Sequence, residues 1–307
     1  MNKDEKLTKK KKKYSCTDKV FFGITYTVFG LLALICIYPF YYLVINTVSR
    51  NDYVDLGVVM YRPIGFHIQN YINIFKLDNV ANSMFISVSR TVLGTFLPVL
   101  FTTILAYLFT KEHMKHRKFL YRLTIITMYF SAGMIPIYMN IKMLGLLDNY
   151  WVYIIPGLIR VYNLVLVKTF IESLPAALEE SAQIDGAGYV KRFIHIILPL
   201  SKPILATVAL FSAVSAWNSY MDTLLYITDS KLYTLQFTLY EYLNQATAIA
   251  SSINSMTDTS MLDRATQIST TSVRNTMAVV TIIPIICVYP FIQRYYVQGV
   301  MIGAVKG

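Results

Sequence analysis

The chain has 307 residues, of which 55% are hydrophobic and only 15% are charged, and its mean hydropathy is +0.48. Soluble domains carry about 25% charged residues, so this composition excludes an ordinary soluble protein and predicts an all-α integral membrane protein. The formal net charge of +11 lies in short runs beside apolar segments, which indicates cytoplasmic membrane loops and argues against nucleic-acid binding.

The N-terminal part of the chain predicts one membrane helix and one external loop. Residues 1–19 form a basic tail centred on Lys9–Lys13, which we expect in the cytoplasm. The apolar residues 20–48 are too many for the apolar part of a signal peptide, so they predict the first transmembrane helix. Residues 49–80 carry little net charge and predict an external loop.

Residues 81–297 predict a permease-like core with five more transmembrane helices. The expected spans are 82–110, 119–147, 150–170, 203–227 and 275–292. The basic loop 111–118 and a polar segment at about 175–199 are expected in the cytoplasm, and the Ser/Thr-rich segment 228–274 outside. Six spans in contact with membrane lipid place both termini in the cytoplasm, with residues 298–307 as a C-terminal tail. The prediction is a polytopic six-helix membrane protein.

Residue patterns typical of enzymes and metal sites do not occur in the sequence. The four histidines are scattered and the three cysteines form no disulfide framework, so we expect no metal site and no catalytic centre. No phosphate-binding GxxxxGK[ST] loop occurs, so the chain is not expected to bind ATP or another cofactor. An ion-coupled secondary transporter would need carboxylates at broken helices, and Asp222 is the one candidate within a predicted span.

The polar segment at 175–199 predicts a pair of short helices. Pro175 suits the first turn of a helix, and Gly186 permits a sharp turn at its end. Asp185 is placed to cap a second helix, which Pro199 is expected to end. An amphipathic helix on the membrane surface is the alternative, but such a helix does not need a fixed spacing of residues.

The spacing of this segment resembles the EAA loop of binding-protein-dependent ABC importer permeases. That loop reads Glu-Ala-Ala, three residues, Gly, nine residues and Ile-x-Leu-Pro, and here Ser181 replaces the first alanine. The resemblance implies a type I importer fold in which the cytoplasmic coupling-helix pair sits in a groove of the ATP-binding subunit. The residues to which it assigns this coupling are Glu180, Ala182, Asp185, Gly186, Ile196, Leu198 and Pro199.

Further segments are similar to maltose-type carbohydrate permeases, and residues 289–307 are similar to the polysaccharide- and oligosaccharide-uptake branch. The other similar segments are Gly133–Pro136, Trp217–Tyr220 and Leu232–Gln236. The resemblance implies import of a carbohydrate, of oligosaccharide size, through a bacterial plasma membrane. It also implies a second permease subunit, two subunits that hydrolyse ATP-Mg and an external solute-binding protein. Lys306 and Gly307 would approach the ATP-binding dimer, with a frayed polar tail as the alternative. A permease for a non-sugar solute is the alternative function.

Charged and aromatic residues of the predicted spans are candidates for the solute pathway. An unpaired charge inside a membrane is unfavourable, so Arg90, Arg160 and Asp222 are expected to face a partner or a wet cavity. Aromatic rings and amides suit sugars, and the candidates are Arg160, Tyr162, Asn163, Trp217, Asn218 and Tyr220. The structural alternatives are an Arg160–Asp222 pair, interface anchoring by Trp217 and an interhelical bond from Asn218. An unpaired Arg160 in the pathway would favour an acidic oligosaccharide.

Overall fold

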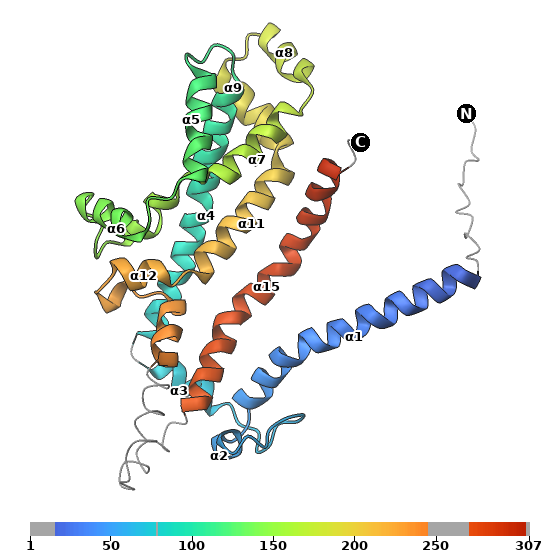
Figure 1. Cartoon of the computed structure of the whole chain (residues 1–307), viewed down its shortest axis with the longest axis vertical. Coiled ribbons are helices and arrows are strands. Elements are labelled where there is room, and N and C mark those ends of the chain that lie inside the picture. Colours follow the sequence, from blue (N-terminus) through green and yellow to red (C-terminus); the bar gives the residue numbers. More distant parts are fainter. Residues whose placement is uncertain (1–15, 78, 245–269, 305–307) are drawn as a thin grey trace.

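Helices make up the architecture of this chain. The computed structural model describes residues 16–77, 79–244 and 270–304, and these ranges contain no strand. Three helices are long and apolar enough to cross a membrane (Figure 1): α1 (Cys16–Thr47), α4 (Val80–Thr110) and α15 (Thr270–Ala304). Their apolar stretches reach the roughly 30 Å of a bilayer core at about 1.5 Å of rise per residue. The all-α prediction is confirmed.

These three helices occupy the positions of the first, second and sixth predicted spans. Because α15 continues past the predicted sixth span, residues 298–304, which were expected in a tail, extend the helix instead. The predicted external segment 49–80 contains two short helices, α2 (Asn51–Asp55) and α3 (Gln69–Lys76). Three predicted features lie partly or wholly outside the described residues: the basic tail 1–19, the segment 228–274 and the pair Lys306 and Gly307.

The third predicted span, 119–147, is not a continuous helix. α5 (Arg117–Tyr129) ends after 13 residues, which span about 20 Å. A break precedes α6 (Met134–Met143), where Gly133 has a φ of +85° that glycine adopts without strain. Figure 1 shows α6 directed to the side of α5. By length and composition the described residues therefore give three candidate spans, or up to five if each bent helix pair counts as one, rather than six regular ones.

The fourth predicted span is bent. It begins with two 3-10 turns, η1 (Tyr150–Tyr153) and η2 (Ile155–Gly157), and continues as α7 (Val161–Glu172), with an angle of 47° between the two parts. Arg160 precedes α7 in an extended conformation, with a ψ of 118°. This residue therefore occupies the break between the helices rather than a turn of regular helix.

The fifth predicted span, 203–227, is bent at its start and interrupted near its end. The helical stretch 189–200 meets α11 (Lys202–Asn218) at an angle of 78°. α11 ends at Asn218, and α12 (Met221–Tyr226) follows after a short break. The 3-10 turn η4 (Ser230–Leu232) and a helical stretch at 235–244 complete this part of the chain.

α4 lies at the centre of the helix bundle, and α7 and α11 pack along it (Figure 1). Near one end, Ala106 of α4, Leu164 of α7 and Val208 of α11 are at most 1% exposed and form one apolar cluster. Gly94 of α4 faces α11, where an added Cβ would lie 3.6 Å from the Cβ of Ala216. Small residues thus let these two helices approach closely. The three-helix bundle carries the polar segment at its end.

α1 stands apart from this bundle. No residue of its apolar window is buried within the chain as far as the structure describes it, and Figure 1 shows the helix joining the rest only at its C-terminal end. There Ile45 packs with Val54 and Val59 in a small buried cluster. The remaining apolar surface of α1 requires lipid or another membrane helix as its environment.

Candidate functional site

The polar segment folds as a helix, a glycine turn and a second helix. The first helix, α8, spans Ala176–Ile184. Gly186 has a φ of +78°, a left-handed conformation that glycine adopts without strain. The Gly186 amide donates to the Gln183 carbonyl at 3.0 Å, and the Ala187 amide donates to the Ala182 carbonyl at 2.9 Å. These two bonds form a Schellman motif, which explains why the segment needs a glycine four residues after Ala182.

The second helix begins differently from the prediction. It consists of α9 (Tyr189–Arg192), the π-helical turn η3 (Phe193–Ile197) and α10 (Leu198–Leu200). Its N-cap residue is Gly188 and makes no side-chain cap bond, so the prediction of an Asp185 cap is wrong; Asp185 is the C-cap residue of α8. The helix ends at Leu200, one residue after Pro199, and the chain bends at Ser201.

An ionic cluster joins the helix pair to the end of α4. The Glu179 carboxylate of α8 accepts hydrogen bonds from Lys111 Nζ, at 2.5 Å to each oxygen, and from the Tyr107 hydroxyl at 2.8 Å. Arg192 Nη1 of α9 lies 3.5 Å from Glu179 Oε1 and donates to Gln183 Oε1 at 2.9 Å. One acidic side chain of α8 therefore accepts hydrogen bonds from the end of α4 and lies beside a cation of α9.

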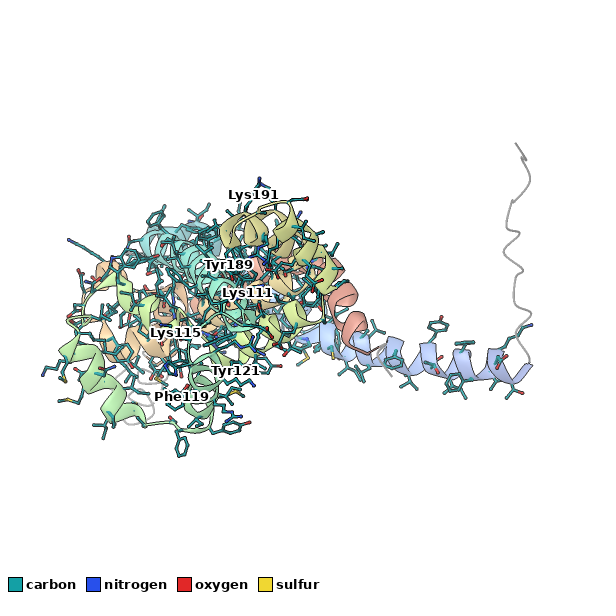
Figure 2. The ribbon with its side chains drawn as sticks, turned by 90° about the horizontal axis from the view of Figure 1, so that it is seen from above. Lys111, Lys115, Phe119, Tyr121, Tyr189 and Lys191 are labelled. Atoms are coloured by element: carbon teal, nitrogen blue, oxygen red, sulfur yellow. The ribbon has the colours of Figure 1, made fainter. Side chains whose placement is uncertain are left out.

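Aromatic rings pack against the two cations of this cluster. The Lys111 ammonium lies 4.1 Å from the centroid of the Tyr107 ring, and the Arg192 guanidinium lies 4.5 Å from that of Tyr189. Figure 2, which looks onto this end of the bundle, shows Lys111 and Tyr189 within its outline and Lys191 at its margin. Cations held over aromatic faces gain additional stabilisation, so the cluster has a defined geometry.

The electrostatic balance keeps Glu179 ionised. Burial raises the pKa of this carboxyl, but the hydrogen bonds from Lys111 and Tyr107 and the positive charges of Lys111 and Arg192 outweigh burial. The pKa of Glu179 consequently lies below its ordinary value. At neutral pH the cluster therefore contains a carboxylate with positively charged neighbours from two different helices.

The residues that the sequence assigned to coupling lie on the outer side of this arrangement. Four of them are exposed: Glu180, Asp185, Gly186 and Pro199. The other three are half-buried: Ala182, Ile196 and Leu198. Sequence reasoning missed Glu179 and its partners Tyr107, Lys111 and Arg192. One signal was present, because consecutive helix residues point about 100° apart, so Glu179 and Glu180 could not both face α4.

The predicted pathway residues divide between exposed and buried positions. Arg160 and Tyr162, at the start of α7, are exposed, whereas Asn163 is only 4% exposed. Trp217 is buried, and its indole N–H donates to the Thr281 carbonyl of α15 at 3.1 Å. The alternative in which Trp217 anchors the chain at the membrane interface is therefore wrong.

Two further predicted pathway residues contact the helical stretch 235–244. Asn218 is exposed, and its Oδ1 accepts a hydrogen bond from Gln236 Nε2 at 3.3 Å. The Tyr220 ring stacks on that of Tyr240, with 4.8 Å between the centroids. The interhelical bond considered for Asn218 is thus present in the structure.

The structure pairs Asp222 with Arg90 instead of with Arg160. The Arg90 guanidinium, on α4, donates to the Asp222 carboxylate and, at 2.9 Å, to the Ser219 carbonyl. It also lies 4.5 Å from the centroid of the Tyr153 ring. The alternative of an Arg160–Asp222 pair is wrong, and no described residue forms an ion pair with Arg160.

Comparison of the sequence with known protein families identifies the family of this chain. The model of the binding-protein-dependent transport system inner membrane component matches residues 98–302. The chain belongs to this family. As a member, it is a membrane permease component of a transport system rather than an enzyme, and the resemblance to ABC importer permeases is confirmed.

Individual relatives match this chain over nearly their whole length. The chain is 35% identical over 290 residues to the polygalacturonan/rhamnogalacturonan transport system permease protein YtcP of Bacillus subtilis, and the alignment covers 94% of this chain and 99% of the relative. It is 25% identical over 288 residues to the arabinooligosaccharides transport system permease protein AraQ of Halalkalibacterium halodurans, covering 91% and 94%. A solved bacterial ABC transporter involved in import of the acidic polysaccharide alginate matches with a TM-score of 0.81 and 28% identity, covering 92% of this chain and 99% of that one.

Proposed function

We propose that this chain is a permease subunit of an ABC importer that carries oligosaccharides into the bacterial cytoplasm. Separate subunits would hydrolyse ATP-Mg, a second related permease would complete the pathway, and an external solute-binding protein would deliver the cargo. The transport systems named for the relatives carry polymers or oligomers of sugars, which supports this class of cargo. The observation that carries the proposal is the exposed helix pair with the spacing of an importer coupling loop.

The shape of the helix pair supports docking to an ATP-binding subunit. In the described part of the chain no residue of α8 is buried, so this helix is not held by an apolar core of its own. Short helices that expose most of their surface at the end of a membrane bundle are suited to a groove on a soluble partner. A hollow of ≈ 250 Å³ beside α8 is lined in part by Glu180, Gln183 and Tyr189, and it has room for a side chain of that partner.

We extend the proposal to acidic oligosaccharides as cargo. The matched alginate transporter imports an acidic polysaccharide, and Arg160 is an exposed cation in the fourth predicted span. Because Asp222 is held by Arg90, it does not neutralise Arg160. A guanidinium can bind a uronate carboxylate through two parallel hydrogen bonds, and the exposed Tyr162 ring could pack on a sugar face.

The orientation of the chain in the membrane follows from the position of the helix pair. The helix pair must face the cytoplasm in order to meet ATP-hydrolysing subunits, and the lysine-rich loop 111–118 lies at the same end of the bundle. An even number of crossings would then place both termini on that side.

The test is uptake by proteoliposomes that contain the complete transporter. We expect uptake of labelled oligosaccharides to require both ATP inside and the solute-binding protein outside, and to survive collapse of the proton and sodium gradients. Acidic oligosaccharides should be taken up in preference to neutral ones of the same length. Uptake that continues without ATP and stops when the gradients collapse would instead identify a secondary transporter.

A further inference from the structure

We propose that Glu179 is the positioning residue that fastens the coupling helices to α4, so that a displacement of α8 moves α4 with it. This inference rests on the proposed coupling function, and it assigns to Glu179 a role distinct from that of Glu180. Glu180 would meet the ATP-binding subunit, whereas Glu179 would transfer the resulting movement into the membrane.

The attachment of α8 is polar. Because no residue of this helix is buried in the described chain, apolar packing alone does not fix its position on the bundle. Its side-chain bonds to other helices come from Glu179, whose side chain is 20% exposed, and from Gln183, which accepts from Arg192. Glu179 alone of these two reaches α4. Removing its charge should therefore loosen α8 without unfolding it.

The donors on α4 are arranged to receive one carboxylate. Tyr107 and Lys111 are four residues apart, so they share one face at the end of α4. Lys111 is the C-cap residue of α4, where a positive charge is favourable beside the helix C-terminus. Tyr107 is itself buried, at 4% exposed, and its position is therefore fixed by the core. A displacement of Glu179 with α8 would therefore be transmitted to a well-packed part of α4 rather than to a mobile side chain.

α4 can carry such a movement to the opposite half of the bundle. It is one helix of 31 residues that includes Pro98, and in its N-terminal half Arg90 holds Asp222 and the Ser219 carbonyl at the break between α11 and α12. Ionic contacts therefore link the C-terminal end of α4 to α8 and its N-terminal half to the α11–α12 break. Packed helices and ion pairs can carry energetic coupling between distant sites, and these contacts form one connected series.

Glu180, the neighbouring acid, faces outward and is available for docking to the ATP-binding subunit. Glu180 is exposed, and in the described part of the chain no residue makes a hydrogen bond or ion pair with it. Two adjacent acids with identical chemistry thus differ in what they face. This difference separates attachment from docking in an experiment.

The experiment compares four variants in the complete transporter, reconstituted with its solute-binding protein. Glu179→Gln removes the charge at nearly constant shape, and the pair Glu179→Lys with Lys111→Glu exchanges the charges. Glu180→Gln tests docking, and Glu172→Gln removes the Lys168–Glu172 pair, which lies within α7 and joins no two helices. The measurements are the amount of ATP-binding subunit that co-purifies, the thermal midpoint of the complex, and the number of solute molecules transported per ATP hydrolysed.

We expect Glu179→Gln to keep wild-type co-purification but to lower transport per ATP by about tenfold, as expected for lost charge-assisted hydrogen bonds. Its thermal midpoint should fall, because Lys111 and Arg192 lose their counter-ion. The exchanged pair restores the contact between a lysine and a glutamate but brings the new lysine beside the Arg192 guanidinium, so it should recover part of the wild-type ratio. Glu172→Gln should retain the full ratio. Wild-type transport per ATP in Glu179→Gln, or loss of co-purification in that variant, would overturn the inference. Unchanged co-purification and transport in Glu180→Gln would count against the docking role of Glu180 and leave the Glu179 result to be judged separately.

Discussion

The turn at Gly186 gives a sharp quantitative test of the helix pair. An added Cβ at this position meets no atom within 4 Å, so replacing the glycine causes no steric clash with neighbouring groups. Any destabilisation of the turn must therefore come from the backbone conformation. The φ of Gly186 is +78°, and the left-handed conformation costs a residue with a Cβ about 1–2 kcal/mol. We expect Gly186→Ala to reduce the population of the turn about fivefold, and the β-branched Gly186→Val to reduce it further.

A neighbouring glycine provides the matched control. Gly188 also has no atom within 4 Å of an added Cβ, but its φ is −69°, which any residue adopts. Gly188→Ala should therefore leave the Gly186 turn intact, although it makes the same chemical change two residues away, and its effect should be confined to the N-cap of α9. Asparagine tolerates the left-handed region better than alanine, so Gly186→Asn should fall between wild type and Gly186→Ala.

Hydrogen exchange measures the turn directly, because the Ala187 amide is protected by its bond to the Ala182 carbonyl. A peptide that covers residues 182–188 should exchange about fivefold faster in Gly186→Ala than in Gly188→Ala. Solute-stimulated ATP hydrolysis in the reconstituted transporter should decrease in the same order. Equal exchange rates and equal stimulation in these two variants would refute the assignment of a Schellman turn to the coupling function.

Three further predictions follow from the polar contacts. Arg160→Gln should reduce uptake of acidic oligosaccharides selectively, and an equal loss for neutral ones would contradict a carboxylate contact. Asp222→Asn leaves the buried Arg90 guanidinium without its counter-ion and should destabilise the protein by about 3 kcal/mol, which differential scanning fluorimetry can detect as a lower midpoint. Hydrogen bonds from the Thr228 side chain and from the Thr228 and Asp229 amides lower the pKa of Asp148, so its stabilisation is complete above the ordinary carboxyl range and is lost as pH falls through the lowered value. Below about pH 4, the thermal midpoint of Asp148→Asn should accordingly change less with pH than the thermal midpoint of the wild type does.

Features encoded by nearby residues were predictable from the sequence. The length and apolarity of a segment decide whether a helix can cross a membrane, and α1, α4 and α15 follow that rule. The turn from Ala182 to Gly186 was predictable for the same reason, because its hydrogen bonds join residues at most five apart and its φ admits glycine above all others. The break before α6 also had a local cause in Gly133, but apolar composition alone did not reveal where the helix would end.

Pairings between distant residues depended on the tertiary structure. Asp222 could have met Arg160 or Arg90, and the packing of α11 along α4 brought Arg90, 132 residues away, into contact with it. Trp217 has the chemistry of a sugar platform, yet α15 covers it and accepts its N–H.

The different contacts of Glu179 and Glu180 also depended on the tertiary structure, although the two residues lie in one helix turn. Both are glutamates in one polar helix, and their sequence context is nearly identical. The sequence determined that this helix would be exposed and would end at a glycine. Only the orientation of α8 against α4 decided which carboxylate receives Lys111 and Tyr107 and which one faces outward, because an ion pair depends on the distance between two side chains in space.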